Sequence, residues 1–420
     1  MVYVTVKQPP RYHQMSLEEF LFSDVESSVI VNPNLTNTRT YTVEEPSERL
    51  MSRISVRKMI GSLIRFNDSA KELREVPRYK LYKTYYIPKS SGGLRRIDEP
   101  RPELKCALYK LKAVFETDFA FVGGAQYHTS AFAYIKKRGT LDAIKRHQQN
   151  ESKWKAKYDL SNFFGSTTQE FVMEMLSMIF PFSEVIRQEV GKREMEMALD
   201  LAFLNGGLPQ GSPLSPLITN IMMIPIDHRL SNDFREFRGA GRKEENRNMP
   251  QKFICTRYAD DFIISSRYDF SYKAIEAHIM QVLRGFHAPF EINSEKTKYG
   301  SFLGSNWNLG LMLNGNNEIT VGYKNKRRFQ AMLSSYIMDR KKGVRWDLHD
   351  IQTMEGYRNY YRMVEKDTID RIVKHIDDKF GVDVVSMIRE DISNRPGNPG
   401  KVSEFTEYDP EEYDDSDIPF

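Results

Sequence analysis

Two adjacent aspartates, Asp260 and Asp261, interrupt an apolar stretch of the chain in the segment TRYADDFIISS, residues 256–266. The runs on either side are rich in β-branched and aromatic residues and predict two strands, 252–258 and 262–268, joined by a tight turn. Burying an unpaired carboxylate is costly. An isolated Asp–Asp pair is most often a solvated turn, so a functional interpretation needs support from elsewhere in the chain.

Two further blocks give that support. YDLSNFF, residues 158–164, reads as a strand that ends at Asp159, followed by a turn and a helix from about Gln169. GGLPQGSPLSPLITN, residues 206–220, begins as a glycine–proline loop and continues with helical spacing of apolar residues. Carboxylates at strand ends and turns from separate parts of a chain can converge on Mg²⁺, which prefers oxygen ligands. Two such ions can clamp the attacking and leaving oxygens of an in-line phosphoryl transfer.

In their order and spacing, the three blocks resemble the catalytic core of a reverse transcriptase, over about residues 53–365. The resemblance implies RNA-directed DNA polymerase activity, a nucleotidyltransferase reaction. It also implies an α+β fold of the right-hand polymerase type, with fingers, a palm built on an antiparallel sheet, and a helical thumb. The implied divisions are an N-terminal arm (1–52), fingers (53–155), a palm with insertions (156–310), a mostly helical and basic thumb (311–395) and an acidic disordered tail (396–420).

The resemblance assigns roles to individual residues. Asp159 and Asp260 would bridge two Mg²⁺ ions, and Asp261 would contribute less directly. Phe164 would stack under the sugar and exclude a ribose 2′-hydroxyl, which is compatible with its packing in the core. Lys296, in NSEKTKYG, would protonate the leaving pyrophosphate, although an ordinary surface lysine would look the same in the sequence.

A second group of residues is expected to bind the incoming deoxynucleotide (dNTP). Gln210 and Gly211 match the family's nucleotide-contacting loop, where glycine permits close backbone approach. The segment LYKTYYIPKSSGGLRRIDEP, residues 81–100, predicts a basic hairpin with a glycine turn. Arg95 and Arg96 lie in this hairpin, where the family places triphosphate-binding residues, and arginine suits bidentate phosphate contact. We favour Arg96, but the sequence does not separate the two.

The charge distribution indicates a polyanionic partner. The net charge of +4 includes a tail, residues 401–420, with eight acidic residues and one lysine; residues 1–400 carry 60 basic and 49 acidic residues, a net +11. We interpret the tail as solvated rather than as a competitor for the basic groove. The thumb interleaves aromatic and basic residues, which suits RNA, although such runs often form only a solvated helix face. The residues expected to bind RNA are Lys324, Lys326, Arg327, Arg328, Lys341, Lys342 and Arg345.

Other classes of protein are disfavoured by composition. Cys106 and Cys255 are the two cysteines, so a structural zinc site or a disulfide framework is not expected. No run of eighteen apolar residues is present, and the N-terminus lacks a signal-peptide pattern. We therefore expect a cytoplasmic enzyme without a membrane partner; the sequence does not indicate its oligomeric state.

Further segments narrow the resemblance. IPKSSGGLRRIDEPRPELK, residues 87–105, resembles the bacterial retron-like branch, but LDAIKRH, residues 141–147, departs from that branch's Asn-Ala-x-x-His element. The segments at residues 304–333 and 356–364 resemble the stand-alone defence-associated reverse transcriptases, type 2 most closely. That group would copy an associated structured non-coding RNA into cDNA that acts against phage.

Four alternatives stay open. One is a retron enzyme that primes from a branched guanosine and makes RNA-linked DNA. Another is an untemplated polymerase primed on one of its own 22 tyrosines. The third, from a different class, is a catalytically silent RNA-binding scaffold, and the intact aspartates argue against it. A template-dependent RNA polymerase would instead prefer ribonucleotides.

Overall fold

The computed structural model describes residues 46–89, 92–119, 127–242, 248–302 and 309–393. The expected acidic tail, most of the expected N-terminal arm, and Ser90 and Ser91 of the hairpin turn lie outside these residues. The chain divides into two compact units, Met1–Gly300 and Ser301–Phe420. None of the described helices combines the length and the apolar content needed to cross a membrane.

A four-stranded sheet in the order β4-β5-β3-β6 is the centre of the first unit. Strand β5 pairs antiparallel with both β3 and β4. The expected strand ending at Asp159 and the expected strands around the aspartate pair are confirmed. Asp261 differs from expectation, because it is the first residue of β5 rather than a turn residue. The strands are β3 (Trp154–Asp159), β4 (Ile254–Tyr258), β5 (Asp261–Ser266) and β6 (Lys298–Ser301).

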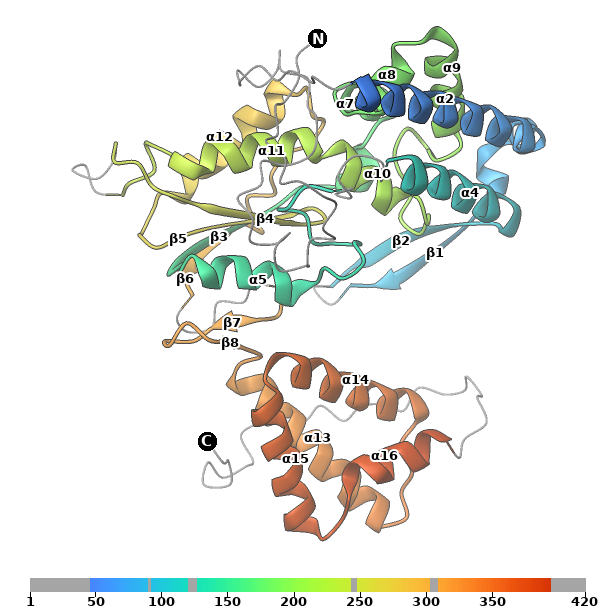
Figure 1. Cartoon of the computed structure of the whole chain (residues 1–420). Coiled ribbons are helices and arrows are strands. Elements are labelled where there is room, and N and C mark those ends of the chain that lie inside the picture. Colours follow the sequence, from blue (N-terminus) through green and yellow to red (C-terminus); the bar gives the residue numbers. More distant parts are fainter. Residues whose placement is uncertain (1–45, 90–91, 120–126, 243–247, 303–308, 394–420) are drawn as a thin grey trace. The chain divides into compact units, whose positions relative to one another are not determined.

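Helices cover both faces of this sheet. Helices α11 (Ile224–Asp233) and α12 (Tyr272–Gly285) lie over one face, and α5 (Thr140–Gln149) lies under the other (Figure 1). His147 of α5 is fully buried, and its two ring nitrogens bond to the hydroxyls of Ser265 and Thr256. Burial lowers the pKa of His147 to about 3, so this histidine is a neutral structural link between α5 and the sheet.

The expected basic hairpin forms as β1 (Tyr82–Pro88) paired antiparallel with β2 (Leu94–Pro100). Helix α2 (Pro46–Ser69) packs on α4 (Pro102–Phe119), whose apolar residues Leu104, Leu108 and Leu111 are completely buried. The other helices of this unit are α3 (Lys71–Glu75), η2 (Arg78–Leu81), α6 (Phe163–Ser166), α7 (Gln169–Leu176), α8 (Phe182–Ile186), α9 (Glu189–Asp200), α10 (Ser215–Met222) and η3 (Phe234–Glu236).

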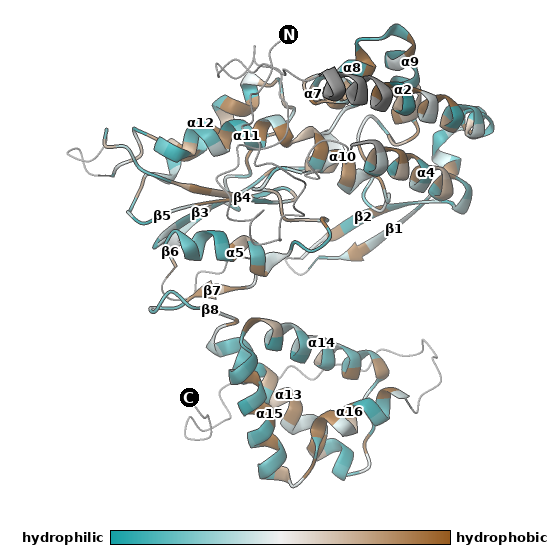
Figure 2. Cartoon of the chain, viewed as in Figure 1, coloured by the Kyte–Doolittle hydropathy of each residue, from teal (hydrophilic) through white to brown (hydrophobic). Residues whose placement is uncertain are grey.

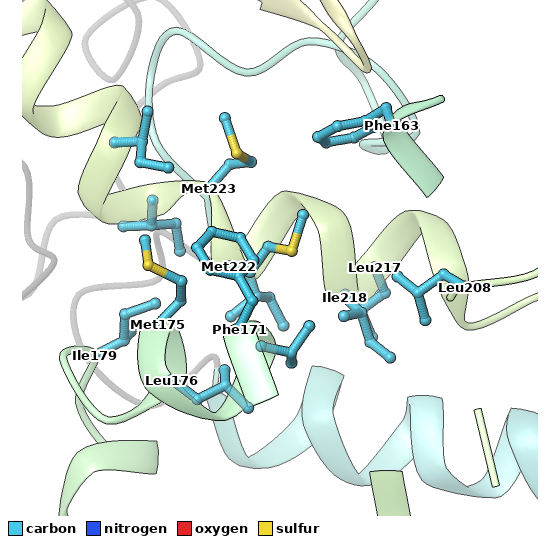
Figure 3. Close-up of a cluster of buried hydrophobic side chains, with 14 of the residues drawn as sticks. Phe163, Phe171, Met175, Leu176, Ile179, Leu208, Leu217, Ile218, Met222 and Met223 are labelled. Atoms are coloured by element: carbon cyan, nitrogen blue, oxygen red, sulfur yellow. The ribbon is translucent and has the colours of Figure 1, made fainter. Parts of the chain in front are cut away.

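Helices α7 and α10 form part of the core beside the sheet. Helix α10 begins at Ser215 with a proline in its first turn, where a missing backbone N–H costs nothing. Its apolar residues at helical spacing meet Phe171 and Met175 of α7 (Figure 3). This packing anchors the C-terminal end of the glycine–proline loop, because α10 starts directly after that loop.

The second unit is largely helical, as expected for residues 322–395. Its short strands, β7 (Met312–Leu313) and β8 (Ile319–Thr320), form a small hairpin. Asp347 caps α14 by accepting a hydrogen bond from the His349 backbone at 2.7 Å. The helices present hydrophilic surfaces around a shared apolar interior (Figure 2). They are α13 (Tyr323–Lys341), α14 (Leu348–Val364), α15 (Lys366–Phe380) and α16 (Val384–Ser393).

Candidate active site

Strand pairing brings the three predicted aspartates together at one end of the sheet. Asp159, the last residue of β3, lies directly opposite Asp261, the first residue of β5. Asp260 occupies the turn between β4 and β5, and its carbonyl accepts a hydrogen bond from the Leu160 backbone at 3.0 Å. Residues that are about a hundred positions apart in sequence therefore form one acidic cluster.

The electrostatics of this cluster favour a bound cation. Burial and then the charge of Asp261 raise the pKa of Asp260 to about 6, and the charge of Asp159 adds to the effect. Burial also raises the pKa of Asp261, although its hydrogen bond to Lys157 opposes the shift. The Oδ1 atom of Asp261 is buried and has no hydrogen-bond partner in the described part of the chain. Carboxylates held close together repel one another, and a nearby cation favours their charged form. A divalent cation would therefore stabilise this cluster.

Two lysines neutralise part of this charge. The Nζ atom of Lys157 lies 2.6 Å from Oδ2 of Asp261. The Nζ atom of Lys296 lies 3.1 Å from Oδ2 of Asp159. The turn that carries Lys296 is fixed to β3, because the Asn293 backbone donates to the Asp159 carbonyl at 2.8 Å. Across the residues described, no three acidic, histidine or cysteine side chains are already arranged as a metal-ligand cluster.

Phe164 lies on the short helix that follows β3. It is half-buried and packs edge-on against Phe163, with ring centres 5.6 Å apart. Its carbonyl accepts a hydrogen bond from the Leu208 backbone at 2.9 Å, which joins the Phe164 turn to the glycine–proline loop. Gly207 is required here, because a Cβ at that position would lie 2.2 Å from the carbonyl oxygen of Gly165.

The same loop joins the basic hairpin. The Gln210 carbonyl accepts a hydrogen bond from the Asp98 backbone of β2 at 2.8 Å. Gly211 has a φ of +118°, and a Cβ there would meet the Asp98 carbonyl at 3.0 Å. Only glycine combines this backbone conformation with so close an approach. The loop therefore connects the Phe164 turn to β2, and β2 carries Arg95 and Arg96.

Comparison with known proteins identifies the family. The profile of "Reverse transcriptase (RNA-dependent DNA polymerase)" matches residues 87–330, more than half of the chain. The chain belongs to the reverse transcriptase family. It is an RNA-directed DNA polymerase, and the α+β right-hand polymerase fold expected from the sequence is confirmed.

Two bacterial relatives agree with the retron-like resemblance. The chain is 27% identical to the retron Ec83 reverse transcriptase of Escherichia coli over 320 residues, which cover 74% of this chain and 90% of that protein. It is 26% identical to the retron Ec73 reverse transcriptase of Escherichia coli over 289 residues, 67% of this chain and 83% of that protein. The predicted membership of the bacterial retron-like group is confirmed, while the narrower defence-associated group stays a prediction.

Solved structures include a more distant likeness. The telomerase of Candida albicans, solved with the TWJ fragment of telomeric RNA, superposes with a TM-score of 0.39 at 12% identity. The superposition covers 74% of this chain and 59% of that one.

The two hairpin arginines of this reverse transcriptase have different surroundings. Arg96 forms an ion pair with Asp98 at 3.0 Å, and Thr84 donates to the same carboxylate oxygen at 2.6 Å. Arg95 is exposed on the other face of β2. Tyr134 lies within electrostatic range of both Arg95 and Asp260. The arginine favoured from the sequence, Arg96, is thus paired within the hairpin, while Arg95 lies near Tyr134.

The residues expected to bind RNA also differ from one another. Lys326 pairs with Glu365 at 3.0 Å, and Lys341 donates to the Phe380 carbonyl at 2.7 Å, so both stabilise the helical unit itself. Lys324, Arg328, Lys342 and Arg345 are exposed, and Arg327 is half-buried. Arg328 lies near the Tyr361 ring of α14.

Sequence reasoning missed three residues at the site. Lys157 precedes Asp159 by two positions in β3, so it lies on the same face of the strand, and this spacing is a usable signal. Tyr134 is 60% exposed and has a left-handed backbone with a φ of 61°, which is unusual for a bulky side chain. Arg257, just before the aspartate turn, is fully buried. No local pattern marks Tyr134 or Arg257, because their neighbours come from distant segments.

Proposed function

We propose that this reverse transcriptase adds deoxynucleotides by a two-Mg²⁺ mechanism at Asp159 and Asp260, copying an associated structured non-coding RNA into cDNA for defence against phage. The observation that carries the catalytic part is the cross-strand pairing of Asp159 with Asp261, with Asp260 in the adjoining turn. This pairing supports the roles that the sequence resemblance implied.

The residues fit Mg²⁺. Asp159, Asp260 and Asp261 offer hard oxygen donors, and Mg²⁺ typically uses one or two protein carboxylates together with water and substrate phosphates. The buried and unpartnered Oδ1 of Asp261 and the raised pKa of Asp260 are both features that a cation would relieve. Lys157 supplies positive charge at the other carboxylate oxygen of Asp261, Oδ2, and Lys296 supplies it at Oδ2 of Asp159.

Each residue then has a defined task. When bound, Mg²⁺ would activate the primer 3′-hydroxyl and offset the charge of the triphosphate. Asp159 and Asp260 hold the metal site, and Asp261 supports it through its contact with Lys157. Lys296 is available to donate a proton to the departing pyrophosphate once it has left Asp159.

The dNTP would bind between the loop and the hairpin. Phe164 would lie against the sugar, with Gln210 and Gly211 beside the base pair and Arg95 or Arg96 on the triphosphate. The hydrogen bonds from the loop to the Phe164 turn and to β2 support this arrangement. In this assignment, the first unit supplies fingers and palm and the helical unit supplies the thumb. The exposed Lys324, Arg328, Lys342 and Arg345, together with Arg327, would contact the RNA phosphates.

The test replaces Asp260 with asparagine. We expect Asp260→Asn to reduce DNA synthesis on an RNA template by at least about 1,000-fold, because a metal ligand is lost while the shape is kept. The matched control is Asp200→Asn, which removes a carboxylate from a surface pair with Arg78 and should leave the rate unchanged. If Asp260→Asn synthesised DNA at the normal rate, the catalytic assignment would be wrong. If synthesis were lost but phage protection persisted, the defence role would not depend on cDNA.

A retron reaction is the second candidate, because the two most similar relatives reported above are named as retron enzymes. Sequencing the RNA and DNA that copurify with the protein separates the candidates. DNA joined to RNA would favour the retron reaction, and free cDNA copied from a structured RNA would favour our proposal. DNA attached to a tyrosine, detected by mass spectrometry, would indicate protein priming instead.

A further inference from the structure

An ion pair is sealed inside the protein directly behind the aspartate turn. Arg257 and Asp227 are both completely buried. The guanidinium and the carboxylate form a two-pronged contact, with Nε to Oδ1 and Nη2 to Oδ2 both at 2.8 Å. Well-packed apolar residues often replace such a pair without loss of stability. Its presence therefore raises the question of what else Arg257 does.

The third nitrogen of Arg257 contacts the turn itself. Its Nη1 atom donates to the carbonyl oxygen of Ala259 at 3.0 Å. Ala259 directly precedes Asp260 and has a left-handed φ of 58°. A non-glycine residue in this conformation is strained and persists only when its surroundings hold it. Arg257 supplies such a constraint, because its hydrogen bond fixes the direction of the Ala259 carbonyl.

Other segments hold Arg257 in place. Asn220 of α10 lies with Oδ1 3.4 Å from both Nη1 and Nη2, and its amide nitrogen donates to the Ala133 carbonyl at 2.8 Å. The backbone of Arg257 bonds on both sides to the segment Ser130–Phe132. The side chain of Arg257 thus connects α10 and α11 to Ala259, and its backbone connects the same residue to Ser130–Phe132.

We propose that Arg257 is a positioning residue, which uses Asp227 as its anchor to set the conformation of the Ala259–Asp260 turn and so hold Asp260 beside Asp159. This inference rests on the proposed catalytic role of Asp260. Arg257 touches neither substrate nor metal in this proposal, and it acts only through the backbone of Ala259.

The competing explanation is that the ion pair is only a packing element. The double variant Arg257→Met/Asp227→Leu distinguishes the two, because it removes both charges and fills the space with apolar groups. A packing role predicts that the double variant recovers both thermal stability and polymerase rate relative to the single variants. Our proposal predicts that stability recovers while kcat stays about 100-fold low, with a smaller change in KM.

A measurement on the metal-free protein gives a second readout. The Leu160 amide donates to the Asp260 carbonyl, so its hydrogen exchange reports whether the turn is held against β3. We expect the double variant to exchange this amide faster than the native protein, with no change at the Ile264 amide in the centre of β5. Native-like exchange at Leu160 together with a native rate would overturn the proposal.

A milder variant keeps the test meaningful if the double variant fails to fold. Arg257→Lys retains the charge facing Asp227, but one ammonium group cannot reproduce the contacts of three guanidinium nitrogens. We expect this variant to fold, to exchange Leu160 faster and to lose kcat. A folded Arg257→Lys protein with native exchange and native kcat would contradict the proposal.

The matched control is Arg229→Met. Arg229 pairs with Asp233 on α11, the helix that also carries Asp227, and both side chains are partly exposed. Among the described residues, no hydrogen bond or ion pair joins Arg229 to the turn. It should leave kcat and the Leu160 exchange unchanged. Failure of the positioning role is separable from failure of the catalytic role. If Asp260→Asn abolishes synthesis but the double variant has a native rate, only the positioning role is wrong.

Discussion

Two of the cation–carboxylate pairs around the proposed catalytic aspartates differ in almost every physical respect. The first, which we call the front pair, joins Lys296 to Asp159 through one flexible ammonium group, and the lysine side chain is 61% exposed. The second, which we call the rear pair, joins Arg257 to Asp227. Both side chains are 0% exposed, and they make a two-pronged contact. The front pair can be exchanged for another cation, whereas the rear pair cannot be reached by solvent or substrate.

This difference indicates two distinct roles. The front lysine can leave its carboxylate when another cation binds, whereas the rear arginine holds its position. A metal ion or a phosphate can displace a half-exposed lysine at little cost, because water and screening already weaken that contact. A buried pair loses several kcal/mol when one partner is removed. The proposed catalytic carboxylates therefore combine an exchangeable lysine partner with a turn that a buried ion pair holds in place.

The largest effect should come from breaking the rear pair. We expect Arg257→Met or Asp227→Leu alone to lower the free energy of unfolding by about 3–5 kcal/mol, because each leaves a buried charge without its partner. Urea denaturation measures this. Arg229→Met, which breaks a partly exposed pair on the same helix, should lower the free energy of unfolding by only about 1 kcal/mol. An equal loss of unfolding free energy in Arg257→Met and Arg229→Met would show that the buried rear pair contributes no more to stability than an exposed pair.

Phe164 tests the front of the site. We expect Phe164→Ala to raise the kcat/KM ratio for ribonucleotides over deoxynucleotides by about 10- to 100-fold, because the pocket beside the sugar becomes larger. The control is Phe163→Leu, which alters the buried neighbouring ring. It should lower stability without changing sugar choice. An unchanged ratio in Phe164→Ala would show that this ring serves only the core.

The dependence of stability on pH should reveal the raised pKa of Asp260. The pKa of Asp260 is raised from 3.8 to about 6, so the folded metal-free protein holds its proton more tightly than the unfolded chain does. Stability in EDTA should therefore fall as the pH rises from about 4 to about 6. Added Mg²⁺ should stabilise the protein increasingly over the same interval and then level off. Thermal denaturation with and without Mg²⁺ measures both trends.

The Asp260→Asn variant is the control for this titration. It should flatten the pH dependence in EDTA and weaken the stabilisation by Mg²⁺. A native-like titration in this variant would assign the effect to another group.

The smallest change in stability should come from the front lysine. We expect Lys296→Gln to alter the free energy of unfolding by less than about 1 kcal/mol, because the contact is largely solvated. If Lys296 donates a proton to pyrophosphate, kcat should still fall by about 100-fold or more. A stability loss comparable to that of Arg257→Met would show that the front pair is structural as well.

The sequence predicted much of the local structure correctly. The glycine turn predicted the basic hairpin, and the apolar spacing after the glycine–proline loop predicted helix α10. Asp159 was expected at a strand end, which is where β3 stops. These features depend on neighbours within a few residues, so a local pattern is sufficient to predict them.

The partners of individual charges were not predictable in the same way. Arg96, the favoured phosphate ligand, pairs with Asp98 within the hairpin, and Arg95 lies near Tyr134. Which of the two arginines binds phosphate stays a prediction. Lys326 was expected on an RNA-binding surface, yet it pairs with Glu365, 39 residues further along the chain. Such contacts depend on which distant segments the fold brings together.

By itself, the sequence determined that this chain carries a reverse transcriptase core, because the spacing of its aspartate, loop and turn blocks specifies that family. It also determined the strands and helices on which those blocks lie. Only the tertiary structure decided that Lys157 and Lys296 face the aspartates, and that Arg257 is sealed behind them with Asp227 and Asn220. Strand register and helix packing join residues separated by thirty to more than a hundred positions. The two-residue period of a strand and the 3.6-residue period of a helix carry no information about such pairings.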